Sequence, residues 1–197
     1  GNPLVLTECP WCRASIGRAL GAKKKRKAAL AGIKLDKNEG PRLACPRSAC
    51  MFGQEAPETW LPVEVIDERI YRYPPSLVIS TVDKFAMLSY RPDSRALFGL
   101  LAHEGEVGRR AAPPTLIVQD ELHLITAALG TMYALYEPII HELCAVPAGK
   151  GMSYPKIIAS TATLRGAAAQ VKGLYGRMHV HVFPAPGLAM GDSFFGT

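Results

Sequence analysis

Four of the five cysteines form two close pairs, and thiolates at this spacing are typical metal ligands. Cys9 and Cys12 make a C-x2-C pair, and Cys45 and Cys50 make a C-x4-C pair after a spacer of 32 residues. Two such loops can bring four sulfur atoms to one tetrahedral Zn²⁺, and four thiolates leave no open position for catalysis. The pattern therefore predicts a structural zinc ion. Two unrelated pairs, or a redox C-x-x-C, are the alternatives.

A second group of reactive side chains follows an apolar run. Residues 116–118 are Leu-Ile-Val, and Asp120, Glu121 and His123 come directly after them. Ligands of open α/β sheets bind at the carboxyl ends of the strands. An Asp there can hold the Mg²⁺ that bridges nucleotide phosphates, and the neighbouring Glu can activate water. Alternatively, the two acids stabilise the N-terminus of the following helix.

Hydroxyl groups follow two other apolar runs. Ser160, Thr161 and Thr163 come after Ile157-Ile158, and Ser80-Thr81 come after residues 77–79. Each hydroxyl taken singly could cap the helix that follows. Three runs that all end in polar residues favour a shared ligand-binding edge.

The pattern of elements predicts an α/β fold with a parallel sheet. Unbroken apolar runs after prolines indicate strands buried on both faces. We place strands at residues 63–65, 77–79, 116–118 and 157–158. One apolar stripe predicts a helix over 132–143, with a kink or a new helix at Pro138. A second helix spans 167–175 and ends at Gly176, and residues 102–114 form a mobile loop.

Charge divides the 197 residues into two parts. Between Cys12 and Cys45, ten basic residues oppose two acidic ones, a net charge of +8. Because the whole chain carries +6, the remainder carries −2. We therefore predict a basic zinc-binding insertion with four cysteine ligands at 1–55 and an α/β domain at 56–197. The run Lys23, Lys24, Lys25, Arg26 and Lys27 either contacts phosphates non-specifically or forms a solvated loop.

Composition excludes several classes of protein. The apolar fraction of 48% argues against disorder, and five cysteines at low density argue against a disulfide scaffold. No apolar stretch approaches the length of a membrane span, and the first residues lack the pattern of a leader peptide. We expect an intracellular protein without membrane contact. Cys144 lies on the apolar helix, where we expect a core residue.

The ordered polar motifs resemble those of superfamily 2 helicases. Asp120-Glu121-Leu122-His123 is similar to motif II, the DExH box, and Thr161-Ala162-Thr163 is similar to motif III. The stretch 80–85 lies where motif Ib contacts the nucleic-acid backbone. Longer strings, including 183–195, resemble more closely the large helicase of bacterial DISARM antiphage systems. The resemblance covers about residues 60–197 and implies a partial RecA-like sheet flanked by helices.

The resemblance also implies a role for each matching residue. Asp120 would hold Mg²⁺ with ATP, Glu121 would activate water, and His123 would link the ATP site to motif III. Thr161 and Thr163 would relay the nucleotide state. Thr81 would touch a phosphate, and Lys84 belongs to the same nucleic-acid-binding motif. The implied partners are nucleic acid, DNA more than RNA, and other defence proteins.

Two motifs that a helicase needs to hydrolyse ATP have no match in residues 1–197. No G-x-x-x-x-G-K-S/T loop is present, because Gly149-Lys150 lacks the upstream Gly, and no arginine-finger motif follows motif III. We expect the missing pieces to lie outside residues 1–197, and we expect this chain alone to hydrolyse ATP negligibly. A different interpretation stays open: a non-catalytic zinc-bearing nucleic-acid-binding or adaptor module on a degenerate ATPase fold.

Overall fold

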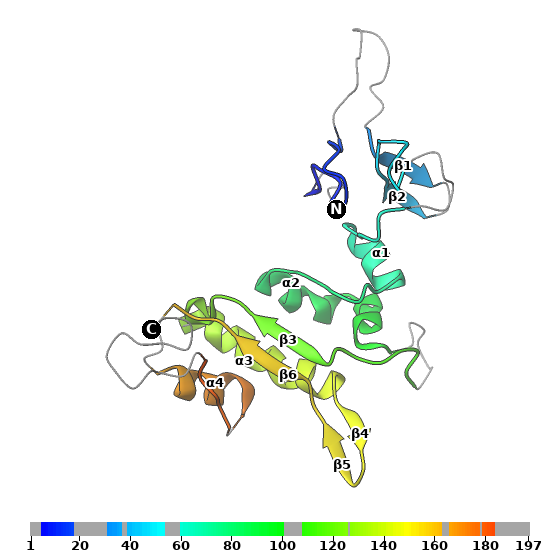
Figure 1. Ribbon diagram of the computed structural model, residues 1–197. Helices are drawn as coiled ribbons and strands as arrows, with labels where there is room; N and C mark the ends of the chain where they lie inside the picture. Colours follow the sequence, from blue (N-terminus) through cyan, green and yellow to red (C-terminus); the bar gives the residue numbers. More distant parts are fainter. Residues whose placement is uncertain are drawn as a thin grey trace. The chain divides into compact units, whose positions relative to one another are not determined.

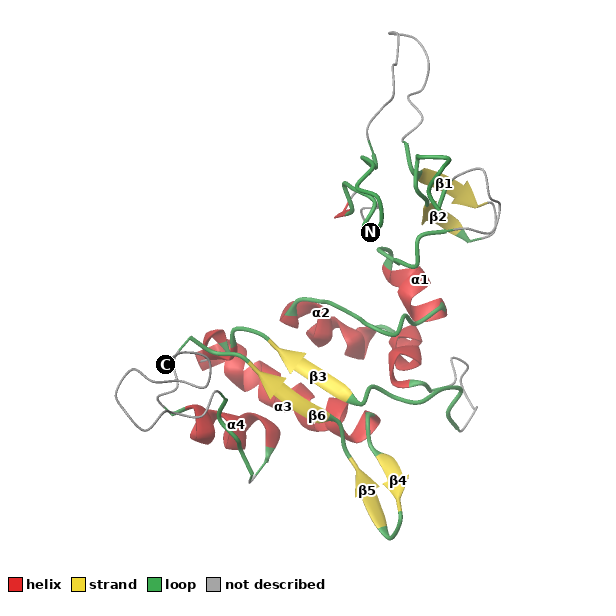
Figure 2. Cartoon of the chain, in the orientation of Figure 1, coloured by secondary structure: helices red, strands yellow, loops and turns green. Residues whose placement is uncertain are grey.

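The computed structural model describes a mixed α/β chain with a small parallel sheet, helices and a cysteine cluster (Figures 1 and 2). The described residues are 5–17, 31–36, 39–53, 60–100, 108–125, 127–162, 166–177 and 179–183. The Lys23–Lys27 run, Thr163, residues 102–107 of the predicted loop and the closing string after Phe183 lie outside them. No described helix has the length and apolar character needed to cross a membrane.

The chain divides into two compact units. The first comprises residues 1–80 and 90–111, and the second comprises 81–89 and 112–197. The boundary near residue 55 and the RecA-like sheet stay predictions.

The first unit is built on a small core around the cysteines. Strands β1 (Ile33–Asp36) and β2 (Gly40–Leu43) pair antiparallel, with Ile33 opposite Leu43. Five buried residues form the core: Cys9, Ile16, Leu43, Cys45 and Leu61. Because two of the five are cysteines, the apolar contribution of this core is small.

A buried arginine joins helix α1 (Asp67–Arg72) to this core. Arg69 is only 5% exposed, and its Nε and Nη2 donate to the two oxygens of Glu64 at 2.7 and 2.8 Å. Its Nη1 donates to Glu39 at 3.1 Å, and Tyr73 donates to the same carboxylate at 2.6 Å. The Tyr73 and Arg69 hydrogen bonds hold the pKa of Glu39 below its usual value. A buried guanidinium needs such partners, so α1 is held by polar bonds. The 3-10 helix at Pro92–Phe98 packs against it.

The second unit contains the parallel pair that positions the polar motifs. Strands β3 (Leu116–Gln119) and β6 (Lys156–Ala159) lie in register, with Leu116 opposite Lys156 and Gln119 opposite Ala159. Helix α3 (Ala127–Leu143) makes the crossover between them (Figure 1). Ile157 and Ala159 pack against a core of Leu122, Ile125, Tyr133, Leu174 and Tyr175.

Two predictions about the strands are wrong. Residues 63–65 and 77–79 form no strand, and the side chains of Leu77 and Ile79 are 75% and 88% exposed. The strands β3 and β6 are not buried on both faces either, since Val118 is 66% exposed. An apolar run becomes a buried strand only where another strand pairs with it. Within the described residues no strand pairs with either run, although Val63 and Val65 pack, partly buried, against the core around the cysteines.

The helix over 132–143 is confirmed within α3, and its apolar stripe is only partly buried. Pro138 lies inside the helix, and no second helix begins there. Leu135 and Ile139 are 66% and 57% exposed, whereas Tyr133 and Glu137 are buried. The buried side of the helix carries Tyr133, Glu137 and Ile140, so only part of the apolar stripe is covered.

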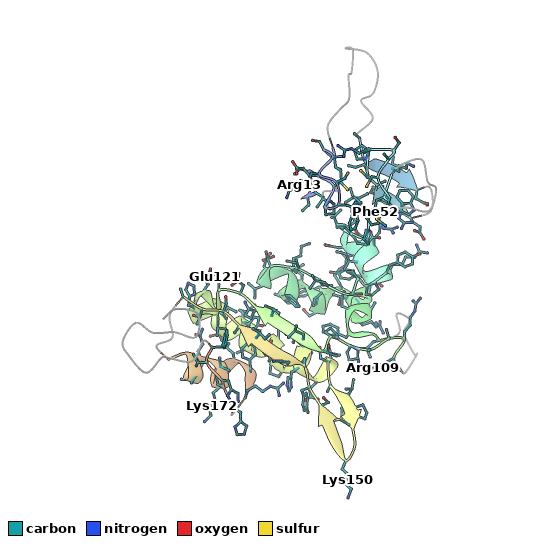
Figure 3. The ribbon with its side chains drawn as sticks, viewed as in Figure 1. Arg13, Phe52, Arg109, Glu121, Lys150 and Lys172 are labelled. Atoms are coloured by element: carbon teal, nitrogen blue, oxygen red, sulfur yellow. The ribbon has the colours of Figure 1, made fainter. Side chains whose placement is uncertain are left out.

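Several other elements complete the second unit. Helix α4 (Ala167–Tyr175) ends as predicted at Gly176, whose φ of 61° is left-handed. The hairpin of β4 (Val146–Ala148) and β5 (Gly151–Ser153) turns at Gly149-Lys150, so this pair serves as a turn, and Lys150 lies at the tip (Figure 3). Helix α2 (Val82–Met87) contacts α3. Cys144 is buried, as predicted.

Two glycines provide a matched test of packing in the first unit. Gly32 and Gly40 both have a φ of +81°, but a Cβ at Gly32 would lie 2.8 Å from the Ala44 carbonyl and 3.1 Å from Ile16. A Cβ at Gly40 would meet nothing within 4 Å. We expect Gly40→Ala to cost about 1 kcal/mol of unfolding free energy from the left-handed backbone alone. Gly32→Ala should cost more, by roughly 1–3 kcal/mol, because of overpacking. Denaturant unfolding measures both, and equal costs would contradict the packing argument.

Candidate functional site

The structure brings all four predicted metal ligands together. Cys9, Cys12, Cys45 and Cys50 place their sulfur atoms within 4.8 Å of one another, and none forms a disulfide. Two short loops achieve this. In the first, the Arg13 N–H donates to the Cys9 carbonyl at 2.8 Å; in the second, the Gly53 N–H donates to the Cys50 carbonyl at 2.8 Å.

The cysteine cluster fits a tetrahedral metal ion. A zinc ion with Zn–S bonds of about 2.3 Å separates its sulfur ligands by about 3.8 Å. The Cys12 and Cys45 sulfurs are 3.4 Å apart, near that value. The Ala14 N–H lowers the pKa of Cys12 to about 7, whereas burial raises the pKa of Cys45 to about 12. The cluster could therefore hold a metal such as zinc, whose charge would stabilise all four thiolates.

The register of β3 and β6 places Asp120 beside Ser160. Each residue directly follows its strand, and Gln119 lies opposite Ala159. The Ser160 hydroxyl donates a short hydrogen bond to Asp120 Oδ1, and the Glu121 N–H donates to the same oxygen at 2.9 Å. The Ser160 bond, more than the Glu121 bond, lowers the pKa of Asp120. Asp120 is thus an anchored, exposed carboxylate.

Glu121 and His123 complete this strand-end cluster, which we define as Asp120, Glu121, His123 and Ser160. Glu121 has a φ of 52°, a left-handed conformation that non-glycine residues rarely adopt. Its carboxylate lies 3.2 Å from His123 Nδ1. The Ala162 N–H reaches the same nitrogen at 3.3 Å. One ring nitrogen therefore faces both Glu121 and the Thr161-Ala162 segment.

Other predicted site residues lie elsewhere in the second unit or outside the description. Thr81 occupies the N-cap position of α2, but its hydroxyl bonds to the Asp83 carboxylate and does not cap the helix. Lys84 is exposed on α2, and Thr161 is half-buried after β6. Thr163 and the Lys23–Lys27 run belong to the residues left undescribed.

Comparison with known proteins relates the chain to one curated sequence. The DISARM protein DrmA of Bacillus paralicheniformis is 41% identical over an aligned length of 182 residues, which covers 81% of this chain. The chain is similar to a DISARM protein. It spans only 16% of that relative's length. No model of a known protein family matches the chain.

A buried carboxyl lies behind the strand-end cluster, and sequence reasoning missed it. Glu137 on α3 is 2% exposed, and no described residue hydrogen-bonds its carboxylate oxygens. Tyr133, one helical turn earlier, donates to the Gln119 side chain at 3.2 Å, and Gln119 donates to the Asp120 carbonyl at 2.8 Å. This chain of bonds connects the core beside Glu137 to the strand end. The only signal in the sequence is a Glu at i+4 from a Tyr, which is too common to notice.

Burial raises the pKa of Glu137 to about 7, while the nearby Tyr133 hydroxyl and Arg177 partly offset the rise. Burial likewise lowers the pKa of His141, and it raises the pKa of Tyr175 to about 12. The core of the second unit therefore favours a neutral Glu137 below pH 7.

The cysteine cluster predicts a specific metal content. We expect the purified chain to contain about one zinc ion, and Cys50→Ser to lose most of it, because three thiolates hold the ion less tightly. Elemental mass spectrometry measures the metal. Cys144→Ala is the matched control, since Cys144 is buried outside the cluster. A folded chain that contains no metal would contradict this assignment.

The buried Glu137 predicts a pH-dependent stability. Because its folded pKa of about 7 exceeds the ordinary 4.5, the folded chain binds more protons between these values. Its penalty to stability is full above pH 7 and disappears as the pH falls toward 4.5. Relative to Glu137→Gln, wild type should gain about 3 kcal/mol of unfolding free energy between pH 8 and pH 4.5. The comparison cancels titration of His141 and the cysteines, which both proteins share. A pH-independent difference would contradict the raised pKa.

Proposed function

We propose that this chain is a segment of an ATP-dependent nucleic-acid helicase or translocase that acts in antiphage defence. The main observation that supports this proposal is the strand-end cluster, in which the acids after β3 lie against the hydroxyl after β6. Its sequence resembles motifs II and III of superfamily 2 helicases. The 41% identity to a DISARM protein supports the defence role.

The proposed roles follow from the chemistry of each side chain. Asp120 would hold Mg²⁺, because both bonds that described residues make to its carboxylate end on Oδ1 and leave Oδ2 available for a hard cation. A bound Mg²⁺ would neutralise charge on the nucleotide phosphates. Glu121, whose carboxylate is 55% exposed, would accept a proton from the attacking water.

His123 is the proposed connection between the ATP site and motif III. Its Nδ1 cannot accept the Ala162 N–H and donate to Glu121 at the same time, because one nitrogen carries either a lone pair or a proton. A change in the charge near Glu121 would therefore alter the bond to Ala162. Through Thr161 and Thr163, this would pass the nucleotide state to the nucleic-acid-binding surface.

Nucleic acid is the proposed substrate, with DNA favoured over RNA. Thr81 and Lys84 would contact the backbone from α2, and the Lys23–Lys27 run would add non-specific attraction for phosphates. Other defence proteins are the proposed partners.

The test is Glu121→Gln in the full-length protein. No stretch within residues 1–197 matches the loop that holds the phosphates during phosphoryl transfer. The assay therefore uses the full-length protein and not the 197-residue segment. We expect hydrolysis of ATP to fall by about 100- to 10,000-fold, the usual contribution of a general base. Nucleic-acid-stimulated release of phosphate measures it, and thermal unfolding and metal content should stay unchanged.

Glu142→Gln is the control, because Glu142 is an exposed carboxylate on the same unit and away from the strand ends. Normal hydrolysis by Glu121→Gln would overturn the role of Glu121. Absence of hydrolysis in the wild-type protein, with nucleic-acid binding retained, would favour the adaptor module instead.

A further inference from the structure

An exposed tryptophan projects from the first cysteine loop. Trp11 lies between Cys9 and Cys12, and 68% of its surface is exposed. Its ring meets Phe52 of the second cysteine loop edge-on, with ring centroids 6.1 Å apart and an interplanar angle of 81°. The backbone beneath it is held by two bonds, Arg13 N–H to Cys9 carbonyl and Cys9 N–H to Ala14 carbonyl, each 2.8 Å. The loop thus holds a large aromatic surface in the solvent.

Arg13, two residues after Trp11, has a backbone conformation that would suit a glycine better than an arginine. Arg13 has a φ of 58°, the left-handed region that favours glycine. Its backbone N–H closes the loop, and a glycine would do so with less strain. An arginine at such a position gives a reason to look for a role of its side chain. That side chain is exposed (Figure 3).

The second cysteine loop adds another cation. Arg47 is exposed two residues after Cys45, and its N–H donates to the Cys45 sulfur at 3.4 Å. Across the two loops, residues 5–17 and 45–53, Glu8 is the only acidic residue. The spacer between the loops carries a net charge of +8. A polyanion therefore suits this surface better than an apolar protein partner.

We propose that Trp11, Arg13, Phe52 and Arg47 form a stacking platform for single-stranded nucleic acid. One base stacks on Trp11, whose orientation Phe52 supports, while Arg13 and Arg47 bind the flanking phosphates. Aromatic stacking combined with cations binds single strands with little sequence preference, since every base has a π-face. This proposal rests on the proposed nucleic-acid motor and adds to it a specific contact with a single strand. Binding of nucleic acid at the platform requires no ATP.

A single-tryptophan variant provides a direct readout. Trp11 and Trp60 are the two tryptophans of the chain, and Trp60 lies under Arg42, whose guanidinium is 4.4 Å from the ring. In Trp60→Phe, all tryptophan fluorescence comes from Trp11. We expect a 20-nucleotide oligo-dT to quench it, and heparin, a polyanion without bases, to bind without quenching. Equal quenching by both would overturn stacking.

Affinity measurements then test each residue in the 197-residue chain without ATP. We expect Trp11→Ala to weaken oligo-dT binding about 5- to 100-fold, and Trp11→Phe to restore most of it. Arg13→Gly should fold at least as well as wild type but bind more weakly, with a salt slope smaller by about 0.7. Tyr90→Ala is the matched control, because Tyr90 is 72% exposed but lies outside the cysteine loops. Unchanged metal content verifies that the loops are intact.

Two outcomes separate this proposal from the motor itself. If Trp11→Ala binds oligo-dT as tightly as wild type, the platform is wrong, and the exposed Trp11 is better explained as a contact for another protein. If the full-length protein lacks ATP hydrolysis but Trp11 stacks as expected, the motor is wrong and the platform stands.

Discussion

The hydrogen-bonded register between β3 and β6 is the constraint on which the strand-end cluster depends. Parallel strands place residues of equal register side by side, so Asp120 and Ser160 must be neighbours once Gln119 lies opposite Ala159. A slip of β6 by one residue against β3 would turn Ser160 to the opposite face of the sheet from Asp120. The register is held because Ile157 and Ala159 pack on the core of the second unit while the alternating residues point away from it.

The two sets of reactive residues are held by different kinds of force. The strand-end cluster rests on main-chain bonds, such as that from the Leu122 N–H to the Ser160 carbonyl at 2.8 Å, and on the apolar core beneath. The cysteine loops rest on a core of five buried residues, too small for much apolar stabilisation. There, a bound metal would supply most of the stabilisation, with the Arg69 network adding polar bonds.

Local signals predicted local features well. Gly176 ends α4 as predicted because a left-handed residue at a helix end is nearly a property of glycine itself. The spacing within each cysteine pair similarly limits the loops that can contain it. Predictions that depend on contacts with other parts of the chain were less successful. The run at 77–79 has the composition of a buried strand but forms none. Helix α3 buries Tyr133 and Glu137, while Leu135 and Ile139 of its apolar stripe stay exposed.

The order of the amino acids is enough to identify the residues that can do chemistry: four cysteines in two pairs, two acids after an apolar run, and a basic spacer. These follow from side-chain type and short spacing, which need no knowledge of distant contacts. The contacts among them become visible only in the folded chain, where Ser160 bonds Asp120, His123 faces both Glu121 and Ala162, and Trp11 is exposed beside Phe52. Ser160 and Ala162 lie about 40 residues after their partners in the chain, and the exposure of Trp11 depends on which other residues cover its ring. Neither the long-range contacts nor the exposure can be read from the order of the residues.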